Sequence, residues 1–247
     1  NRRFEAMERE QRHDMSMSGI GTVASGVYKT VRIDGISRVK GDIDCITLDS
    51  NGTLNISGSV LGETVKINGT MTISGNLSAE RLILDGMGSV KEMTHCSESA
   101  AINGQVTLEK GLNSEKVEVS GSLKSRGDVE CEVLSVHGGL NVDGLVNAGV
   151  IDLKMSLASK AREIGGDYIT VRRLKKTSIL LQLAPVFNNR LKADLIEGDF
   201  VDLEYTDADV VRGSEVRIGP GCKIGRVEYK VDFKRDGDAQ VGTAKQI

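Results

Sequence analysis

The sequence is poor in the residues that build large aromatic cores and rigid turns. Its 247 residues include no Trp, 4 Phe, 4 Tyr and 2 Pro. A packed core must therefore come from aliphatic side chains, chiefly Val, Ile, Leu and Met. The 4 Cys are too few for a disulfide scaffold in a chain of this length, so we expect reduced thiols.

The sequence also lacks a strong net charge and long apolar runs. It carries 35 Asp and Glu against 32 Lys and Arg, for a formal net charge of −3, which argues against nucleic acid as a partner. No apolar run approaches the ~18 residues needed to cross a bilayer, and no signal-peptide pattern is visible. We therefore expect a cytoplasmic protein.

Glycine, in contrast, is abundant, and its positions repeat. Many of the 29 Gly fall into two sets in which each member follows the last by seventeen positions. The first set contains Gly35, Gly52, Gly69 and Gly86, and the second contains Gly41, Gly58 and Gly75. A fixed period of this kind is the signature of a solenoid, and two glycines per repeat indicate two corners. The step from Gly86 to Gly104 is one position longer, and the apolar pattern places the extra residue between Cys96 and Ala100.

Apolar residues recur with the same period. One such column is Leu48, Val65, Leu82, Ala100, Val117, Leu134 and Ile151. Within each repeat the columns form three pairs, and the two members of a pair are two residues apart, which indicates strands. The predicted fold is all-β: a single-stranded parallel β-helix with a triangular section, in which one coil corresponds to one seventeen-residue repeat.

Two further columns consist of small residues and of polar residues, respectively. The inward column Cys45, Gly62, Ala79, Cys96, Ser114, Cys131, Ala148 and Gly166 is typical of a tight corner, and a metal or redox cluster is the alternative. The column Asp34, Asn51, Asn68, Asp85 and Asn103 precedes the first glycine set, and Asx-Gly is a turn signal. Calcium binding is the alternative interpretation of this second column.

The repeat is interrupted once and ends in polar segments. We predict a flexible N-terminal tail at 1–26, the β-helix at 27–171, a basic and apolar insertion at 172–192, a continuation of the β-helix at 193–233, and a flexible C-terminal tail at 234–247. In the continuation, Ala193, Val210 and Val227 recur with the seventeen-residue period, as do Val201 and Ile218.

The insertion combines basic and apolar side chains, as surfaces that contact membranes do. The residues predicted for contact with a membrane or a partner are Arg172, Arg173, Lys175, Lys176, Leu180, Leu181 and Phe187. Packing of the insertion on the flank of the β-helix is the alternative.

The sequence offers little catalytic chemistry. None of His13, His95 and His137 is accompanied by an acid, base or ligand set, and there is no Gly-rich phosphate loop or Cys-x-x-Cys motif. We predict no catalytic residues, no metal and no cofactor, and hence a protein that is not an enzyme. The alternative is a hexapeptide-type acyltransferase, because the stretch from Ile218 to Gly225 resembles that repeat.

A regular β-helix has two ends whose backbone groups are unpaired and whose core residues are uncovered. End-to-end association would bury both ends and produce a filament without nucleotide. Coverage of the ends by the tails or by the segment 172–192 is the alternative. The residues predicted for this self-assembly interface are Val39 and Ile43 at one end and Ile218 and Ile224 at the other.

The repeats Val39-Lys-Gly-Asp-Ile43, Ile56-Ser-Gly-Ser-Val60 and Ile73-Ser-Gly-Asn-Leu77 resemble those of bactofilins, the polymer-forming cytoskeletal proteins of bacteria. The resemblance covers 27–171, and the later part, with Gly165-Gly-Asp-Tyr-Ile169, looks like a Gram-positive bactofilin-like branch. It implies a right-handed β-helix that polymerises with itself or a paralogous bactofilin. It also implies that the polymer positions cell-envelope, morphogenesis or motility factors at the inner face of the cell membrane. The insertion and the long C-terminal part depart from the family pattern.

Overall fold

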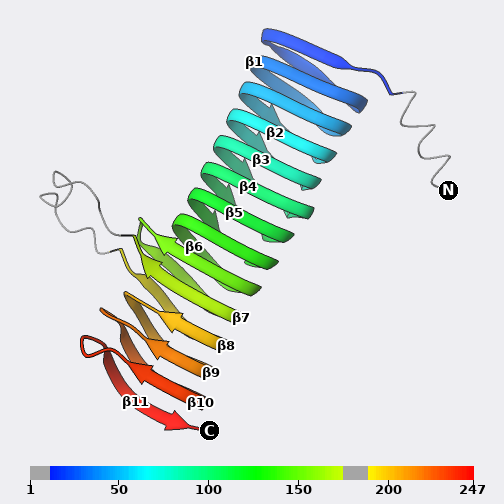
Figure 1. The fold of residues 1–247 in the computed structure, drawn as a ribbon. Helices are drawn as coiled ribbons and strands as arrows, with labels where there is room; N and C mark the ends of the chain where they lie inside the picture. Colours follow the sequence, from blue (N-terminus) through cyan, green and yellow to red (C-terminus); the bar gives the residue numbers. More distant parts are fainter. Residues whose placement is uncertain (1–11, 175–188) are drawn as a thin grey trace, which may run out of the picture. The chain divides into compact units, whose positions relative to one another are not determined.

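The computed structural model describes residues 12–174 and 189–247, and within these residues the regular structure consists of strands without any helix. The protein is a parallel β-solenoid of 11 strands (Figure 1). The strands are β1 (Met15–Ile56), β2 (Val60–Ile73), β3 (Leu77–Val90), β4 (Thr94–Leu108), β5 (Gly111–Ser125), β6 (Asp128–Met155), β7 (Ser159–Arg173), β8 (Leu191–Leu203), β9 (Thr206–Ile218), β10 (Lys223–Arg235) and β11 (Gln240–Gln246). The fold class predicted from the sequence repeat is confirmed.

The chain divides into two compact units, at 1–115 and 116–247, and β5 contains the boundary. In the first unit β1, β2, β3 and β4 are neighbours in sequence order and pair in parallel. In the second unit the same holds for β6 to β11. Within each unit, successive strands therefore pair with one another in sequence order, as in other solenoids.

The strand register reproduces the period seen in the sequence. Ile43 pairs with Val60, a step of seventeen positions (60 − 43 = 17). Between β3 and β4 the step changes, because Leu77 pairs with Thr94 whereas Arg81 pairs with Ser99, one position further along (99 − 81 = 18). The extra residue thus lies between Cys96 and Ser99, as the apolar pattern predicts.

The core consists of three pairs of inward side chains per turn. In one turn these are Ile43 and Cys45, Leu48 and Ser50, and Leu54 and Ile56, all of them buried. The residue between the members of each pair points outward, as alternation in a strand requires. Aliphatic and β-branched residues fill these positions because they suit a pleated surface that is buried on one face only. Each fully buried aliphatic side chain contributes roughly 1.5–3 kcal/mol.

The prediction for the later turns was wrong in register. Ala193 pairs with Ala208 rather than aligning with Val210, and Val201 pairs with Val216 rather than Ile218. The step between β8 and β9 is therefore two positions shorter than the repeat (208 − 193 = 15). The linker explains part of the difference, since only residues 204–205 connect β8 to β9, whereas residues 57–59 connect β1 to β2. Tyr205 closes this shorter corner with φ of +47°, a value that non-glycine residues seldom adopt.

Strand structure extends beyond the predicted limits of 27–233 at both ends. Strand β1 already begins at Met15, inside the predicted tail of 1–26, and β11 lies inside the predicted tail of 234–247. The side chains of β11 are almost all exposed, so backbone pairing with β10 rather than an apolar pattern defines this strand. The predicted insertion of 172–192 falls between β7 and β8, and its residues 175–188 lie outside the described residues.

Candidate functional site

One corner of the first unit is built from a column of glycines. Gly35, Gly52, Gly69, Gly86 and Gly104 have φ between +126° and +141°, which L side chains rarely adopt. A Cβ added to any of them would overlap the carbonyl oxygen of the glycine one turn earlier. The corner therefore requires glycine for two reasons, the backbone conformation and the close approach of successive turns.

The Asx column beside these glycines forms a hydrogen-bonded ladder. Asn51 Nδ2 donates to Asp34 Oδ1 at 3.0 Å, and Asn68 Nδ2 donates to Asn51 Oδ1 at 2.9 Å. Further along the unit, Asn103 Nδ2 donates to Asp85 Oδ1 at 2.7 Å. The amides thus donate to the preceding turn, which supports the predicted corner role. No group of three or more His, Cys, Asp or Glu side chains in the described parts of the chain could hold a metal ion.

The cysteines are free thiols in an apolar environment. Cys45, Cys96 and Cys222 are buried, Cys131 is half-buried, and none forms a disulfide. Burial raises the pKa of Cys96 to about 12, from an ordinary value of 9.0. The pKa of Cys45 is raised to about 12 as well, by burial and by the nearby Asp44 carboxylate. Because the thiolate is the reactive form, these residues act as small core side chains.

The histidines contact groups that do not form a catalytic pair with them. His95 Nδ1 lies 3.0 Å from Asn113 Oδ1, and the His13 ring packs edge-on against Tyr28 with the ring centroids 5.2 Å apart. His137 is exposed.

A groove in the second unit runs over a column of small residues. Its floor includes Ala161, Ala193 and Ala208, and its volume is about 920 Å³. The polar residues that line it are Lys160, Lys192, Asp194, Asp207, Asp209, Lys223, Arg235 and Gln240. Asp207 is already bound by the guanidinium of Arg190, which also donates to the Gly221 carbonyl at 2.7 Å. Among the described residues, no Ser, Cys or His side chain lines this groove.

The four residues predicted for self-assembly lie inside the solenoid rather than at its ends. Val39, Ile43, Ile218 and Ile224 are exposed by 0%, 1%, 1% and 3% respectively. Ile218 pairs with Leu203 on one side and Arg235 on the other, so a turn covers it from each direction. The N-terminal residues fail to mark an end because strand β1 begins at Met15. The C-terminal residues fail because β11 follows them.

The ends of the described solenoid are formed by other residues. Strand β11 pairs with β10 on one side, and among the described residues no strand lies on its other side. In the first turn, which begins at Met15, the first buried side chain is that of Val23, and Met15 and Met17 are only half-buried. At both places apolar side chains or backbone groups are left without a neighbouring turn.

The two described arginines of the predicted contact segment are held by the protein itself. Arg172 forms two parallel hydrogen bonds to the Asp202 carboxylate, at 3.1 Å and 2.6 Å. Arg173 lies over the ring of Tyr205, 3.3 Å from its centroid. The other predicted contact residues, Lys175, Lys176, Leu180, Leu181 and Phe187, lie outside the described residues.

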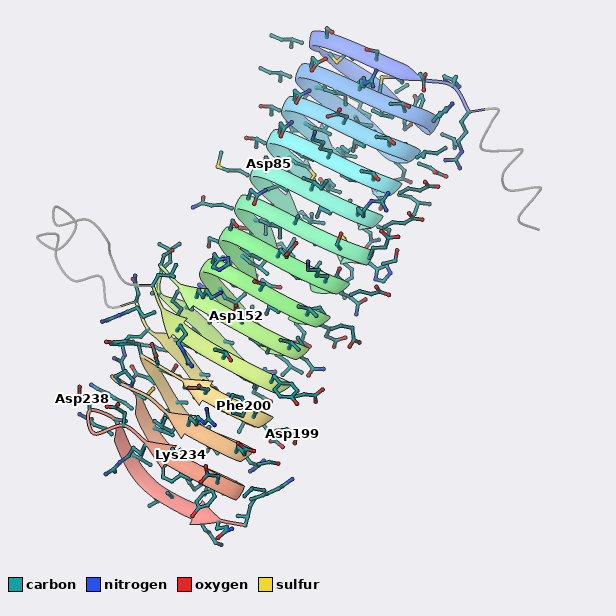
Figure 2. The ribbon with its side chains drawn as sticks, viewed as in Figure 1. Asp85, Asp152, Asp199, Phe200, Lys234 and Asp238 are labelled. Carbon is teal, nitrogen blue, oxygen red and sulfur yellow. The ribbon has the colours of Figure 1, made fainter. Side chains whose placement is uncertain are left out.

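The sequence interpretation missed an apolar stripe on the outer surface of the second unit. It consists of Val133, Val150, Tyr168 and Phe200, and Asp199 lies beside Phe200 on β8 (Figure 2). The available signal was the sequence period that defines the core columns, which also relates Val133, Val150 and Tyr168. The inward columns do not reveal the stripe, because its residues point outward.

Comparison with known proteins gives two relatives. No family model matches the chain, and no solved structure matches it. The chain is 46% identical over 99 residues to the uncharacterized protein YhbF of Bacillus subtilis, and 42% identical over 107 residues to the uncharacterized protein YhbE of the same organism. The matched regions span 40% and 44% of these relatives, and 40% and 43% of this chain. No helix in the described residues is long and apolar enough to span a membrane.

Proposed function

We propose that the protein is a non-enzymatic scaffold of the bactofilin type that associates end to end without nucleotide and positions cell-envelope, morphogenesis or motility factors. The fold is compatible with both a scaffold and an acyltransferase. The observation that carries the proposal is that β11 pairs with β10 on one side and, among the described residues, with no strand on its outer side. An unpaired strand edge of this kind is a template for another strand.

The side chains of β11 suit an edge that is covered by another copy. Val241 lies in an inward column, since it pairs with the buried Ile224, yet it is itself only half-buried. Another turn stacked on β11 would cover Val241 as later turns cover the earlier ones. At the other end, Met15 and Met17 are likewise only half-buried. Association of the two ends would continue the parallel ladder and bury these side chains together.

The partner in this assembly is a second copy of the chain or a paralogue. Two relatives of similar identity occur in one organism, Bacillus subtilis, and this supports the inclusion of a paralogue. Contact with the inner face of the membrane belongs to the proposal as well. Since Arg172 and Arg173 are engaged within the chain, Lys175 and Lys176 would carry that contact.

The test compares two lysine substitutions on the same strand. Val241→Lys places a charge on the core side of the open end, whereas Thr243→Lys alters an outward position, because Thr243 pairs with the exposed Arg226. We expect sedimentation velocity to show loss of large assemblies with Val241→Lys and their retention with Thr243→Lys. Equal sedimentation of both variants and the unmodified protein would refute end-to-end assembly through β11.

A further inference from the structure

The apolar stripe of Val133, Val150, Tyr168 and Phe200 is a local feature of four turns. Val150 pairs with Tyr168, Tyr168 pairs with Phe200, and Val133 precedes Val150 by one repeat of the sequence. The first three are exposed by 36%, 42% and 59%, and Phe200 is partly exposed. The stripe ends at Glu215, which pairs with Phe200 on the following turn.

The fold does not require apolar residues in this column. In the first unit the equivalent register positions are occupied by Thr47, Thr64, Arg81 and Ser99. Two exposed apolar side chains of the first unit have polar neighbours on the following turn: Leu61 pairs with Ser78, and Met87 pairs with Gln105. Single exposed apolar residues are normal, whereas contiguous ones mark interaction sites.

A column of unpaired carboxylates runs beside the stripe. Glu132, Asp167 and Asp199 each directly precede a stripe residue and are exposed, and none forms an ion pair within the described residues. On the turn between Glu132 and Asp167 this column contains Gly149, which has no side chain. Glu132 Oε2 and Asp167 Oδ2 each lie 3.8 Å from the position that a Cβ of residue 149 would take. Asp199 accepts one weak hydrogen bond, from Ser214 Oγ at 3.5 Å.

On the opposite side of the stripe the carboxylates are neutralised. Asp152 is bound by Lys154 at 2.9 Å, and Asp202 is bound by Arg172 at 2.6 Å. The unneutralised negative charge therefore lies along one edge of the apolar stripe. Figure 2 shows Asp199 beside Phe200 at the outer edge of β8, and Asp152 on β6.

The aromatic end of the stripe already binds a cation. The guanidinium of Arg217 lies 5.0 Å from the centroid of the Phe200 ring, a cation–π distance. The ring of Tyr168 lies 6.3 Å from that of Phe200, with an angle of 38° between the planes. Tyr168 is more exposed, and the Asp167 carboxylate precedes it, so its ring offers the same chemistry to a cation from outside.

From these observations we propose that the stripe and its acidic edge bind a basic peptide segment of a partner protein, in which Lys or Arg alternates with aliphatic residues. Successive turns are about 4.8 Å apart, so the four residues span roughly 15 Å, the length of about four to five residues of an extended peptide. Aliphatic side chains of the segment contact Val133 and Val150. Its cationic side chains contact the carboxylates and the ring of Tyr168.

Charge decides between this partner and other classes. The unneutralised edge is acidic, which opposes binding of anionic lipid or nucleic acid and favours a basic polypeptide. The inference rests on the recruiting part of the proposed function, since it names how the scaffold would hold a factor. It does not depend on end-to-end assembly, because the stripe lies on the outer face of the turns.

The probe is a short fluorescein-labelled peptide of alternating Lys and Val, with a peptide of alternating Glu and Val as the negative control. Fluorescence anisotropy is measured on the full chain carrying Val241→Lys, so that loss of assembly cannot be mistaken for loss of binding. We expect the basic peptide to bind and the acidic peptide not to bind. Absence of binding by the basic peptide would overturn the proposal.

Matched variants localise the site. Combining Asp167→Asn with Asp199→Asn should weaken binding about fivefold or more and reduce its salt dependence. The control combines Asp143→Asn with Asp194→Asn, which changes net charge equally at exposed positions outside the stripe, and binding should be unchanged. Equal weakening by both pairs would show non-specific attraction and refute the site.

Substitutions of Tyr168 test the ring itself. Tyr168→Ser should weaken binding by roughly two- to tenfold, and Tyr168→Phe should retain it, since the ring rather than the hydroxyl faces the cation. Because Tyr168 is exposed by 59%, neither change should alter the circular dichroism spectrum. If Tyr168→Ser binds the peptide as tightly as the unmodified chain, the proposal is wrong.

Discussion

Replacement of one corner glycine tests why the Gly column exists. Gly69 has φ of +129°, and an added Cβ would overlap the Gly52 carbonyl oxygen. The backbone strain costs about 1–3 kcal/mol. Relief of the overlap requires the two turns to separate locally, which disturbs a ladder hydrogen bond worth about 0.5–1.5 kcal/mol. Gly69→Ala should therefore lower the free energy of unfolding by about 2–4 kcal/mol.

Urea unfolding followed by circular dichroism measures this change. With a urea dependence of about 1–3 kcal/mol/M, the midpoint should fall on the order of 1 M. Two controls separate the contributions. Gly19→Ala has the unusual φ, +90°, but no atom within 4 Å, so only the strain remains; Gly237→Ala has neither feature and should be neutral. A Gly69→Ala midpoint equal to that of Gly19→Ala would refute the close-approach argument.

Further predictions concern the core and its thiols. Ser50→Ala should leave stability unchanged or raise it by about 1–3 kcal/mol in urea unfolding, because the Ser50 hydroxyl is buried without a hydrogen-bond partner among the described residues; a clear loss would show an unrecognised partner. Leu84→Ala, at a fully buried position, should cost about 2–5 kcal/mol in the same assay, and an unchanged midpoint would contradict its place in the core. Cys96 should react with a thiol reagent at neutral pH only after denaturation, and rapid reaction of the folded protein would contradict its burial. The pKa of the Cys96 thiol is about 12 in the folded protein and 9.0 in the unfolded chain, so its contribution to stability is present below pH 9 and is lost as pH rises toward 12. A Cys96→Ala variant should therefore lose less stability than the unmodified protein over that range, and an identical pH profile would refute the linkage.

The inward columns explain why so much of the fold could be predicted. Each turn buries its residues only against the next turn, so a single period relates positions such as Leu48, Val65 and Leu82. Insertions shift this register without destroying it, and the extra residue after Cys96 could be placed correctly. The corner formed by the Asx and Gly columns could also be predicted, since each of these residue types favours a particular local backbone conformation.

Other features could not be obtained from inward periodicity. The corner at Tyr205 shortens one turn, and a tyrosine gives no sequence signal for positive φ, which among non-glycine residues favours Asn and Asp. Strand β11 is held by backbone pairing, which leaves no hydropathy pattern. For this reason the sequence pattern places Ile218 and Ile224 at the C-terminal end of the solenoid, whereas β11 follows them in the structure. The exposed stripe around Tyr168 depends on which outward residues become neighbours across the turns.

The most direct measurement of the central claim is negative-stain electron microscopy of the purified, untagged chain without added nucleotide. The unpaired edge of β11 and the uncovered first turn predict filaments built by end-to-end stacking. Single, unassociated particles at every concentration tested, with the β-rich fold intact, would contradict that prediction.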